Sequence, residues 1–172
     1  MENNDIDNET LVPSPGMQAL NESEQAAFEH TESAMLELDD RTYLRSLALQ
    51  ALYEMDLAEH SLELALSNRW ESVELENIRK AVVHKLVKGV AEHQSEIDSY
   101  IVKHAPDWPL DQIAVVDRNI MRIAIFEFRI EKSTPKEVAI NEAVELAKMF
   151  CLDSSPRFIN AVLHAVADDS GL

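Results

Sequence analysis

Two helix starts marked by proline, near the end of the chain, constrain its fold most strongly. Pro135 follows Thr134, and Pro156 follows Ser155. A proline in the first helical turn loses no hydrogen bond, because the amide groups there have no partner within the helix. Thr134 and Glu137 also have the spacing of a capping box. The sequence therefore predicts one amphipathic helix from Thr134 and another from Ser155, joined by a short polar turn.

The preceding residues have the same helical character. Apolar residues recur at helical spacing over residues 41–57, 61–67, 73–103 and 115–130. The last of these segments is apolar almost all round, which is typical of a central, buried helix. Gly89 lies inside the third segment, where glycine costs about 1 kcal/mol relative to alanine, so we expect a close helix contact there. With three glycines in 172 residues and no alternating strand pattern, the predicted fold class is all-α.

Charge divides the chain into an acidic arm and a folded part. Residues 1–40 hold eleven of the 32 acidic residues and none of the 15 lysines and arginines. We expect residues 1–38 to be an acidic, largely disordered extension with a weak helix over 21–38. The helical domain is expected over 39–170, in sub-bundles of about 39–105 and 109–170, separated at Pro106 and Pro109. Its mildly acidic balance neither excludes nucleic-acid binding nor argues for it.

The sequence lacks the motifs by which most enzymes and metal-binding proteins are recognised. Cys151 is the only cysteine, which excludes an intramolecular disulfide and a thiolate metal cluster. The six histidines lack metal-binding spacing, and the chain has no glycine-rich phosphate loop or nucleophile motif. We predict no catalysis, no cofactor and no metal. The absence of a secretory start and of a long apolar run predicts a cytoplasmic protein.

Four blocks carry a resemblance to a known family. They are Leu47–Tyr53, Leu86–Val90, Val116–Ala124, and Ile140–Lys148 followed by Arg157–Asn160. In this order they resemble the NusB family of all-helical RNA-binding factors in bacterial transcription antitermination. The resemblance implies two packed three-helix bundles. It also implies binding to boxA-type RNA jointly with the small-subunit ribosomal protein that acts as NusE, within a complex of RNA polymerase and other Nus factors.

The resemblance implies an RNA site on the first helix of the folded part. The candidates are Arg41, Arg45, Gln50 and Tyr53, with the arginines on phosphates and the tyrosine stacked on a base. The alternative is a solvated face in which Arg45 pairs with a nearby acid. The family usually opens with a richer arginine segment, and each missing phosphate contact weakens RNA binding and its salt dependence.

The turn between the last two helices is the implied partner site. Its candidates are Asp153, Ser155, Arg157 and Phe158. The alternative for Phe158 is an ordinary core position. Cys151 stands where the family commonly has a glycine that caps the preceding helix, so we expect either positive φ or a different helix end.

Three further arginines lie on the helix over 115–130. Arg118, Arg122 and Arg129 could face RNA or a partner, or could pair with acids of later helices such as Glu142 and Glu145. We favour the second interpretation, because buried helices require paired charges.

Other functions remain open at this level. The main alternative is a protein–protein adaptor of the same fold with little intrinsic RNA affinity. The helical accessory domain of RNA methyltransferases is less favoured, because no catalytic domain follows Leu172. The acidic arm could be a solubilising extension or could compete with RNA for basic residues.

Overall fold

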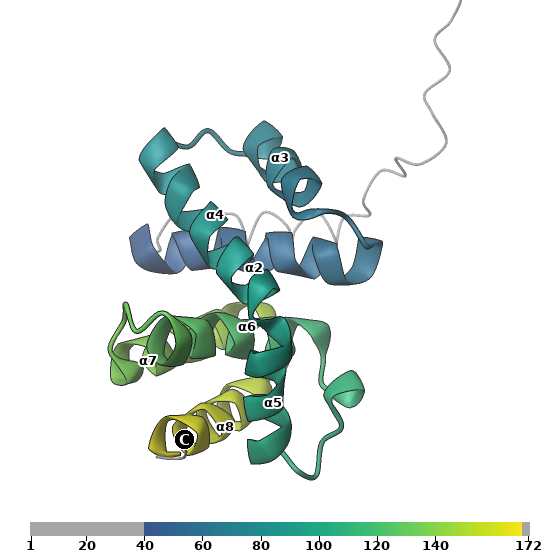
Figure 1. Cartoon of the computed structure of the whole chain (residues 1–172), viewed down its shortest axis with the longest axis vertical. Coiled ribbons are helices and arrows are strands. Elements are labelled where there is room, and N and C mark those ends of the chain that lie inside the picture. The colour runs from purple at the N-terminus through teal and green to yellow at the C-terminus, as the bar shows by residue number, and fades with distance from the viewer. Residues whose placement is uncertain (1–39, 170–172) are drawn as a thin grey trace, which may run out of the picture. The chain divides into compact units, whose positions relative to one another are not determined.

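The computed structural model describes residues 40–169, and these residues are helical throughout apart from short connections (Figure 1). The elements are α2 (Asp40–Ala58), α3 (Leu62–Ser72), α4 (Asn77–Glu92), α5 (Gln94–His104), the 3₁₀ turn η1 (Leu110–Gln112), α6 (Val115–Ile125), the π-helical turn η2 (Phe126–Ile130), α7 (Lys136–Phe150) and α8 (Ser155–Asp168). No strand occurs within the described residues, so the all-α prediction is confirmed. The extension predicted over 1–38, with its helix over 21–38, lies outside them.

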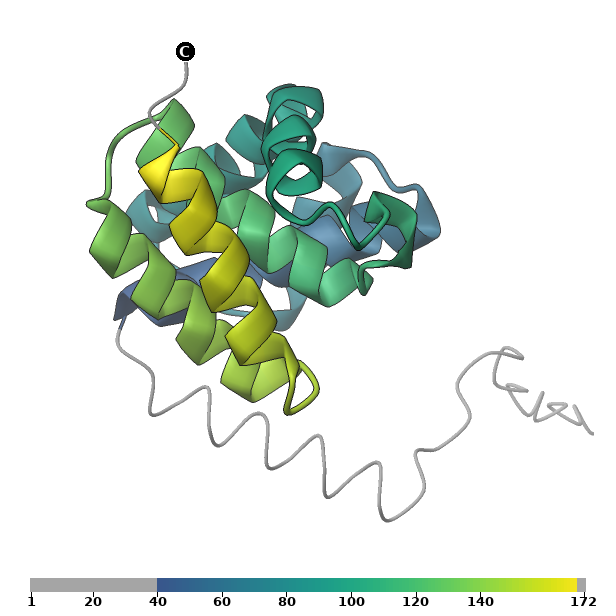
Figure 2. The same ribbon diagram turned by 90° about the horizontal axis from the view of Figure 1, so that it is seen from below.

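α6 is the central helix of residues 40–169. It contacts α2, α7 and α8 along its length, while α3 and α4 cover α2 and α7 lies beside α8 (Figures 1 and 2). Ile120, Met121 and Ile125 of α6 have no exposed surface. The predicted burial of this helix is therefore confirmed. Between residues 40 and 169, no helix combines the length and apolarity needed to cross a membrane.

Most predicted helix limits fall within a few residues of the observed ones. α2 extends the predicted segment by one residue at each end, and α8 begins at Ser155 as expected. α3 continues to Ser72, five residues beyond the prediction. It is capped by Ser61, whose Oγ accepts a hydrogen bond from the Leu64 amide at 3.2 Å.

The helix predicted over 73–103 is wrong as one continuous element. It starts only at Asn77 and breaks at His93, whose φ and ψ of −108° and 13° lie outside the helical region. The His93 amide and ring Nδ1 lie 3.1 and 2.9 Å from the Gly89 carbonyl oxygen, which accepts from both. The non-helical conformation of His93 ends α4, and α5 then packs against α8. Ile97 and Ile101 remain fully buried after the break.

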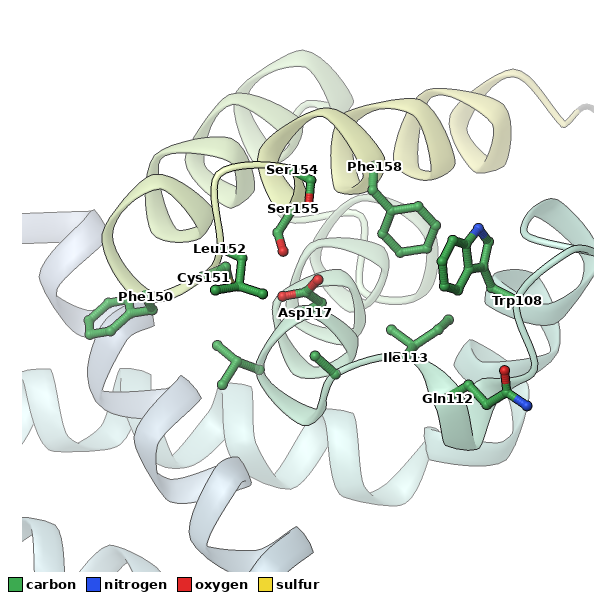
Figure 3. A pocket seen from close by; sticks show the side chains of 12 residues that line it. Trp108, Gln112, Ile113, Asp117, Phe150, Cys151, Leu152, Ser154, Ser155 and Phe158 are labelled. Carbon is green, nitrogen blue, oxygen red and sulfur yellow. The ribbon is translucent and has the colours of Figure 1, made fainter.

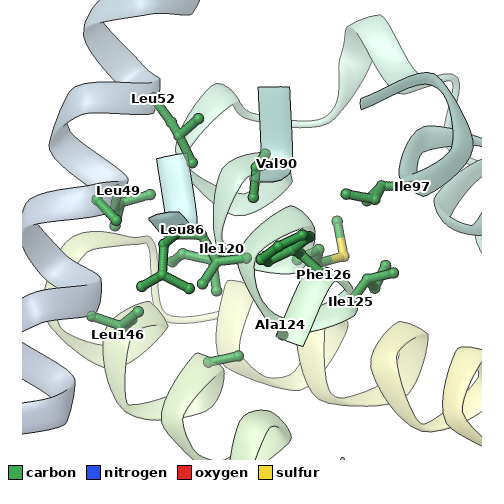
Figure 4. Packing of buried hydrophobic residues seen from close by; sticks show 14 of the residues in the cluster. Leu49, Leu52, Leu86, Val90, Ile97, Ile120, Ala124, Ile125, Phe126 and Leu146 are labelled. Atoms are coloured by element: carbon green, nitrogen blue, oxygen red, sulfur yellow. The ribbon is translucent and has the colours of Figure 1, made fainter. Parts of the chain in front are cut away.

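The close contact predicted at Gly89 is confirmed. The ring of Phe126, at the end of α6, occupies the space that a β-carbon at Gly89 would need. Phe126 is buried within the cluster that also holds Val90, Ile97 and Ile125 (Figure 4). Glycine at this position therefore allows α4 to approach the start of η2.

The predicted capping box at the start of α7 does not form. Pro135 is the cap residue, and no side chain caps the helix. The Thr134 hydroxyl instead donates to Oε1 of Glu127 at 3.1 Å. A tertiary contact with η2 has replaced the local cap, so this prediction was wrong in its bonding, although α7 begins at Lys136.

Candidate functional site

The first turns of α2 hold two arginines in different surroundings. Arg41 is exposed, whereas Arg45 is buried. Nε and Nη2 of Arg45 lie 2.9 and 2.7 Å from the two carboxylate oxygens of Glu127, and Nη1 lies 3.2 Å from Oε2 of Glu142. The same Glu142 oxygen accepts a hydrogen bond from Thr42 at 2.6 Å. The charge of Arg45 is thus balanced by carboxylates from η2 and α7.

Gln50 and Tyr53 lie together further along α2. Both line an open cavity of about 460 Å³ with Leu57 and Phe150. Oε1 of Gln50 accepts a hydrogen bond from Nη1 of Arg69 at 2.6 Å, while the Tyr53 side chain is 41% exposed. A phenol at the mouth of an apolar cavity offers a flat face on which a base can stack.

A polar cluster borders this cavity at Glu54. Burial alone raises the pKa of its carboxyl, but hydrogen bonds with His60 and Asn68 and the charge of Arg69 outweigh that effect and lower the pKa. Nδ1 of His60 lies 2.7 Å from Oε1 of Glu54. The cluster links the second half of α3, and His60 before it, to α2 beside Gln50.

The four residues predicted for RNA binding do not form one compact group. At 1.5 Å per residue, Arg41 lies about 18 Å along the helix axis from Tyr53. The structure brings Gln50 and Tyr53 together, leaves Arg41 exposed at the far end of α2, and places Arg45 inside a buried ion pair.

The turn between α7 and α8 presents the predicted partner residues unevenly. Asp153 and Arg157 are exposed, Phe158 is half-buried and Ser155 is buried. The Phe158 ring packs edge-on against Trp108, with ring centroids 5.9 Å apart and an interplanar angle of 62° (Figure 3). Both rings line a cavity of about 560 Å³.

Trp108 is the residue of this surface that the sequence did not predict. It is 52% exposed and lies in the break between Pro106 and Pro109. An exposed aromatic side chain in a loop held by two prolines is itself a signal of a binding surface. Leu152, which is 80% exposed in the α7–α8 turn, adds apolar surface to the same cavity.

Cys151 ends α7 without positive φ. Its φ and ψ of −119° and 174° are extended, so the helix ends differently from a glycine-capped one, as the second of the two expected possibilities describes. Burial, followed by the neighbouring Asp117 carboxylate, raises the pKa of the Cys151 thiol far above its ordinary range. Both side chains lie at the floor of the Phe158 cavity (Figure 3).

The two cavities are neighbours. Val116 of α6 and Phe150 of α7 line both the one that contains Tyr53 and the one that contains Phe158. The α2 surface and the α7–α8 surface therefore meet at these two side chains, and a ligand on either surface would contact the common wall.

The arginines of the central helix are paired, although with other acids than predicted. Arg122 makes bonds of 2.7 and 2.8 Å to Asp98 and of 2.9 Å to Asp56, and Arg118 lies 3.3 Å from Asp56. Arg129 bonds the Asp169 carbonyl at 2.7 Å.

The predicted acids are engaged elsewhere. Glu142 bonds Arg45, and Glu145 pairs with Lys148 at 2.6 Å. The prediction of pairing is confirmed for Arg118 and Arg122, but its named partners were wrong, because the acids that meet α6 come from α2 and α5. Within residues 40–169, no three His, Cys, Asp or Glu side chains are grouped to hold a metal ion.

Comparison with known proteins places this geometry in a family. The model of the NusB family matches residues 42–168. The transcription antitermination protein NusB of Myxococcus xanthus (strain DK1622) is 40% identical over 127 residues, which cover 72% of this chain and 91% of that protein. The NusB protein of Anaeromyxobacter dehalogenans (strain 2CP-1) is 44% identical over 133 residues, covering 77% and 92%.

Solved structures have the same fold. T. maritima NusB superposes with a TM-score of 0.69 at 30% identity and covers 75% of this chain and 91% of its own. A crystal structure of the antitermination factors NusB and NusE in complex with double-stranded RNA superposes with a TM-score of 0.66 at 26% identity, covering 74% and 95%. From the family model, the identities and the shared helical fold together, we conclude that this chain belongs to the NusB family.

Proposed function

We propose that this chain is an RNA-binding transcription antitermination factor. With the ribosomal protein NusE it binds boxA-type RNA, and the complex assembles with other Nus factors on transcribing RNA polymerase. The observation that carries the proposal is the adjacency of two unlike surfaces, one on α2 and one at the α7–α8 turn, around Val116 and Phe150. The structure of related NusB and NusE proteins with RNA supports it.

The α2 surface is the proposed RNA site. Arg41 provides an exposed charge for a phosphate, and Tyr53 provides a face for a base beside the polar Gln50. Arg45 is proposed to act through position, since its guanidinium holds α2 against Glu127 and Glu142. The basic and aromatic components are separated along the helix, which suits an extended strand better than a compact ligand.

The α7–α8 surface is the proposed NusE site. Its apolar centre is Phe158 with Trp108, and its exposed rim contains Asp153 and Arg157, while Ser155 is buried at the start of α8. An aromatic centre with a polar rim is the usual composition of a protein–protein interface.

Adjacent sites make the assembly cooperative. If NusE and RNA both contact the common wall at Val116 and Phe150, each ligand raises the affinity of the other by the same factor. The proposed mechanism is binding alone, with no catalytic step and no cofactor, and the proposed location is the cytoplasm. We also propose the division into an extension over 1–38 and a domain over 39–170, with sub-bundles of about 39–105 and 109–170.

Fluorescence anisotropy of a labelled boxA RNA tests the proposal. At fixed salt, the full chain should bind boxA RNA more tightly than a scrambled RNA, and NusE should increase that difference. Tyr53→Ala should weaken RNA binding by about 1–3 kcal/mol, or roughly 5- to 150-fold, as expected for a stacked base. Tyr43→Ala, in the first turn of the same helix, is the matched control for losing a phenol from α2.

The second candidate is an adaptor of the same fold with little intrinsic RNA affinity. It is favoured by the burial of Arg45 and by the net charge of −17. In that case the scrambled and boxA RNAs would bind equally weakly with and without NusE, while NusE itself would still bind. Phe158→Ala should then reduce NusE binding, with Leu64→Ala on α3 as an exposed apolar control.

A further inference from the structure

α4 is unusually basic for this chain. Arg79, Lys80, Lys85 and Lys88 place four of the fifteen lysines and arginines within ten consecutive residues, and no acid lies between Glu76 and Glu92. The whole chain has a net charge of −17, so a helix with four bases and no acid between Glu76 and Glu92 departs from its average composition. The function proposed above does not use it.

These bases are exposed. The side chains of Lys85 and Lys88 are 66% and 54% exposed and that of Arg79 is 39% exposed. Lys80 lies over the ring of Trp70 on α3, with its Nζ 5.5 Å from the ring centroid. Arg79, Lys85 and Lys88 are therefore the members of α4 that can meet a ligand from solution without moving a neighbouring ring.

The basic face of α4 is continuous with the start of α2. Arg41 and Lys85 line the same cavity of about 440 Å³, and Nη2 of Arg79 lies 2.7 Å from Oδ2 of Asp40. Figure 1 shows α4 crossing α2, the crossing that brings these residues of the two helices together. The one exposed arginine in the first turns of α2 thus lies beside Lys85 of α4, and Lys88 follows three residues later on the neighbouring part of the helix surface.

The existing ion pairs do not block this face. Arg79 pairs with Asp40, Lys85 with Glu131 and Lys88 with Glu92, the last at 3.7 Å. The Arg79 and Lys88 pairs are exposed on both sides and contribute about 0–1 kcal/mol each, whereas in the Lys85 pair the lysine is 66% exposed and the Glu131 carboxylate 18% exposed. A lysine ammonium also has three donors, so it can keep one carboxylate and still bind a phosphate oxygen.

We propose that Lys85 and Lys88 of α4 form with Arg41 a second RNA contact, the α4 strip, which binds the phosphate backbone without reading bases. The inference rests on the RNA-binding function proposed above and extends its site. It also supplies exposed positive charge that α2 lacks. Arg45 is paired with Glu127 and Glu142, so Arg41 is the exposed arginine in the first two turns of α2.

An acidic protein segment is the competing occupant of this face. Val82 and Ile78 of α4 are 43% and 74% exposed and would anchor an amphipathic peptide. Continuity with Arg41 favours RNA, because a strand that reaches Arg41 from the Tyr53 cavity needs further positive charge where α2 begins. The experiment separates the two occupants.

The test is the salt dependence of boxA RNA affinity for the full chain. Binding of labelled single-stranded RNA is measured from 50 to 200 mM salt for the wild type and for the double variant Lys85→Gln/Lys88→Gln. Losing two phosphate contacts should flatten the log–log slope by about 1.4 and make the variant lose about sevenfold less affinity over this range. The preference for boxA over scrambled RNA should stay unchanged.

Lys103→Gln/Lys148→Gln is the matched control. These lysines are 59% and 57% exposed, each pairs with an acid at 2.6 Å, and neither lines the cavity of Arg41 and Lys85. The control should keep the wild-type slope, and urea unfolding should show both double variants as stable as the wild type.

Three outcomes contradict the inference in distinguishable ways. A wild type that binds no RNA at 50 mM salt overturns the proposed function and the α4 strip together. Specific RNA binding with equal slopes in wild type and Lys85→Gln/Lys88→Gln overturns the α4 strip alone. An unchanged RNA slope together with weakened NusE binding in that variant overturns it and assigns α4 to a protein partner.

Discussion

At the scale of single residues, Arg41 and Arg45 lie one helical turn apart but have different surroundings and different expected roles. Arg45 pairs with the carboxylates of Glu127 and Glu142, and the side chains of Arg45 and Glu127 are only 7% and 6% exposed. Arg41 faces solvent. Arg45 is therefore expected to contribute to stability, and Arg41 to RNA binding.

Arg45→Ala should destabilise the fold strongly. Removing the guanidinium leaves the Glu127 carboxylate buried without its counter-charge, which typically costs about 3–5 kcal/mol. Urea unfolding followed by circular dichroism measures the effect. Arg45→Ala with wild-type stability would show that Glu127 is satisfied by its other bonds.

Arg41→Ala is expected to have the opposite profile. As an exposed substitution it should change the free energy of unfolding by less than about 0.5 kcal/mol. Loss of one phosphate contact should flatten the salt slope of RNA binding by about 0.7. If Arg41→Ala and Arg45→Ala changed the free energy of unfolding and the salt slope equally, the two arginines would not have separate roles in RNA binding and stability.

Glu54 links one residue to the acid stability of the molecule. Its folded pKa lies below the ordinary value of 4.5, so the unfolded chain binds more protons as the pH falls through that range. The resulting stabilisation is fully present above pH about 4.5 and is lost as the pH falls through the lower, folded-state pKa. Glu54→Gln should therefore be less stable than wild type at pH 7, with the difference shrinking in acid.

Denaturation curves from pH 7 to pH 3 measure this difference. Glu63→Gln, an exposed glutamate of α3, controls for the loss of one negative charge. A gap between Glu54→Gln and wild type that stayed constant across the range would contradict the pKa argument.

At the scale of elements, the close contact between α4 and η2 depends on Gly89 having no side chain. Gly89→Ala should raise helix propensity by about 1 kcal/mol, but its methyl group would overlap the Phe126 ring. Because that ring is buried, we expect net destabilisation of about 1–3 kcal/mol.

A double-mutant cycle checks this contact. Phe126→Leu removes the ring atoms nearest Gly89, so Gly89→Ala should be less destabilising in that background than in the wild type. Equal effects in both backgrounds would show that the helices adjust elsewhere.

The elements also show how far local sequence information reaches. Apolar spacing and proline position predicted α2, α8 and the joint span of α6 and η2 closely, because those signals act within one or two helical turns, but they did not predict the change to π-helical bonding at Phe126. The break at His93 accompanies the docking of α5 against α8, which the local spacing of apolar residues does not report. The Thr134 cap was lost to Glu127, a contact that exists only once η2 and α7 have packed.

At the scale of the whole molecule, we expect the shared wall between the two cavities to couple the proposed ligands. Phe150→Ala should lower the factor by which NusE raises RNA affinity, because the side chain lines both cavities. The affinity of each ligand alone should change less than this factor. Anisotropy titrations with and without NusE give the factor, and Leu64→Ala is the control.

The candidate site was predictable in part for a related reason. Tyr53 and Phe158 lie in blocks whose resemblance to a family could be read along the chain, and their role stays a prediction. The partners of Arg45 could not be found in this way, since Glu127 and Glu142 lie 82 and 97 residues away. Trp108 belongs to the same cavity as Phe158 only through tertiary packing.

The single cysteine is a natural chemical probe of the surface at the end of α7. Thiol reagents react with the thiolate, and burial together with the Asp117 carboxylate raises the pKa of the Cys151 thiol, so the reaction at neutral pH should be slow. Cys151 lines the Phe158 cavity at the end of α7, so the rate at which the protein consumes the reagent reports how accessible that cavity is. NusE bound over the cavity should slow the reaction further.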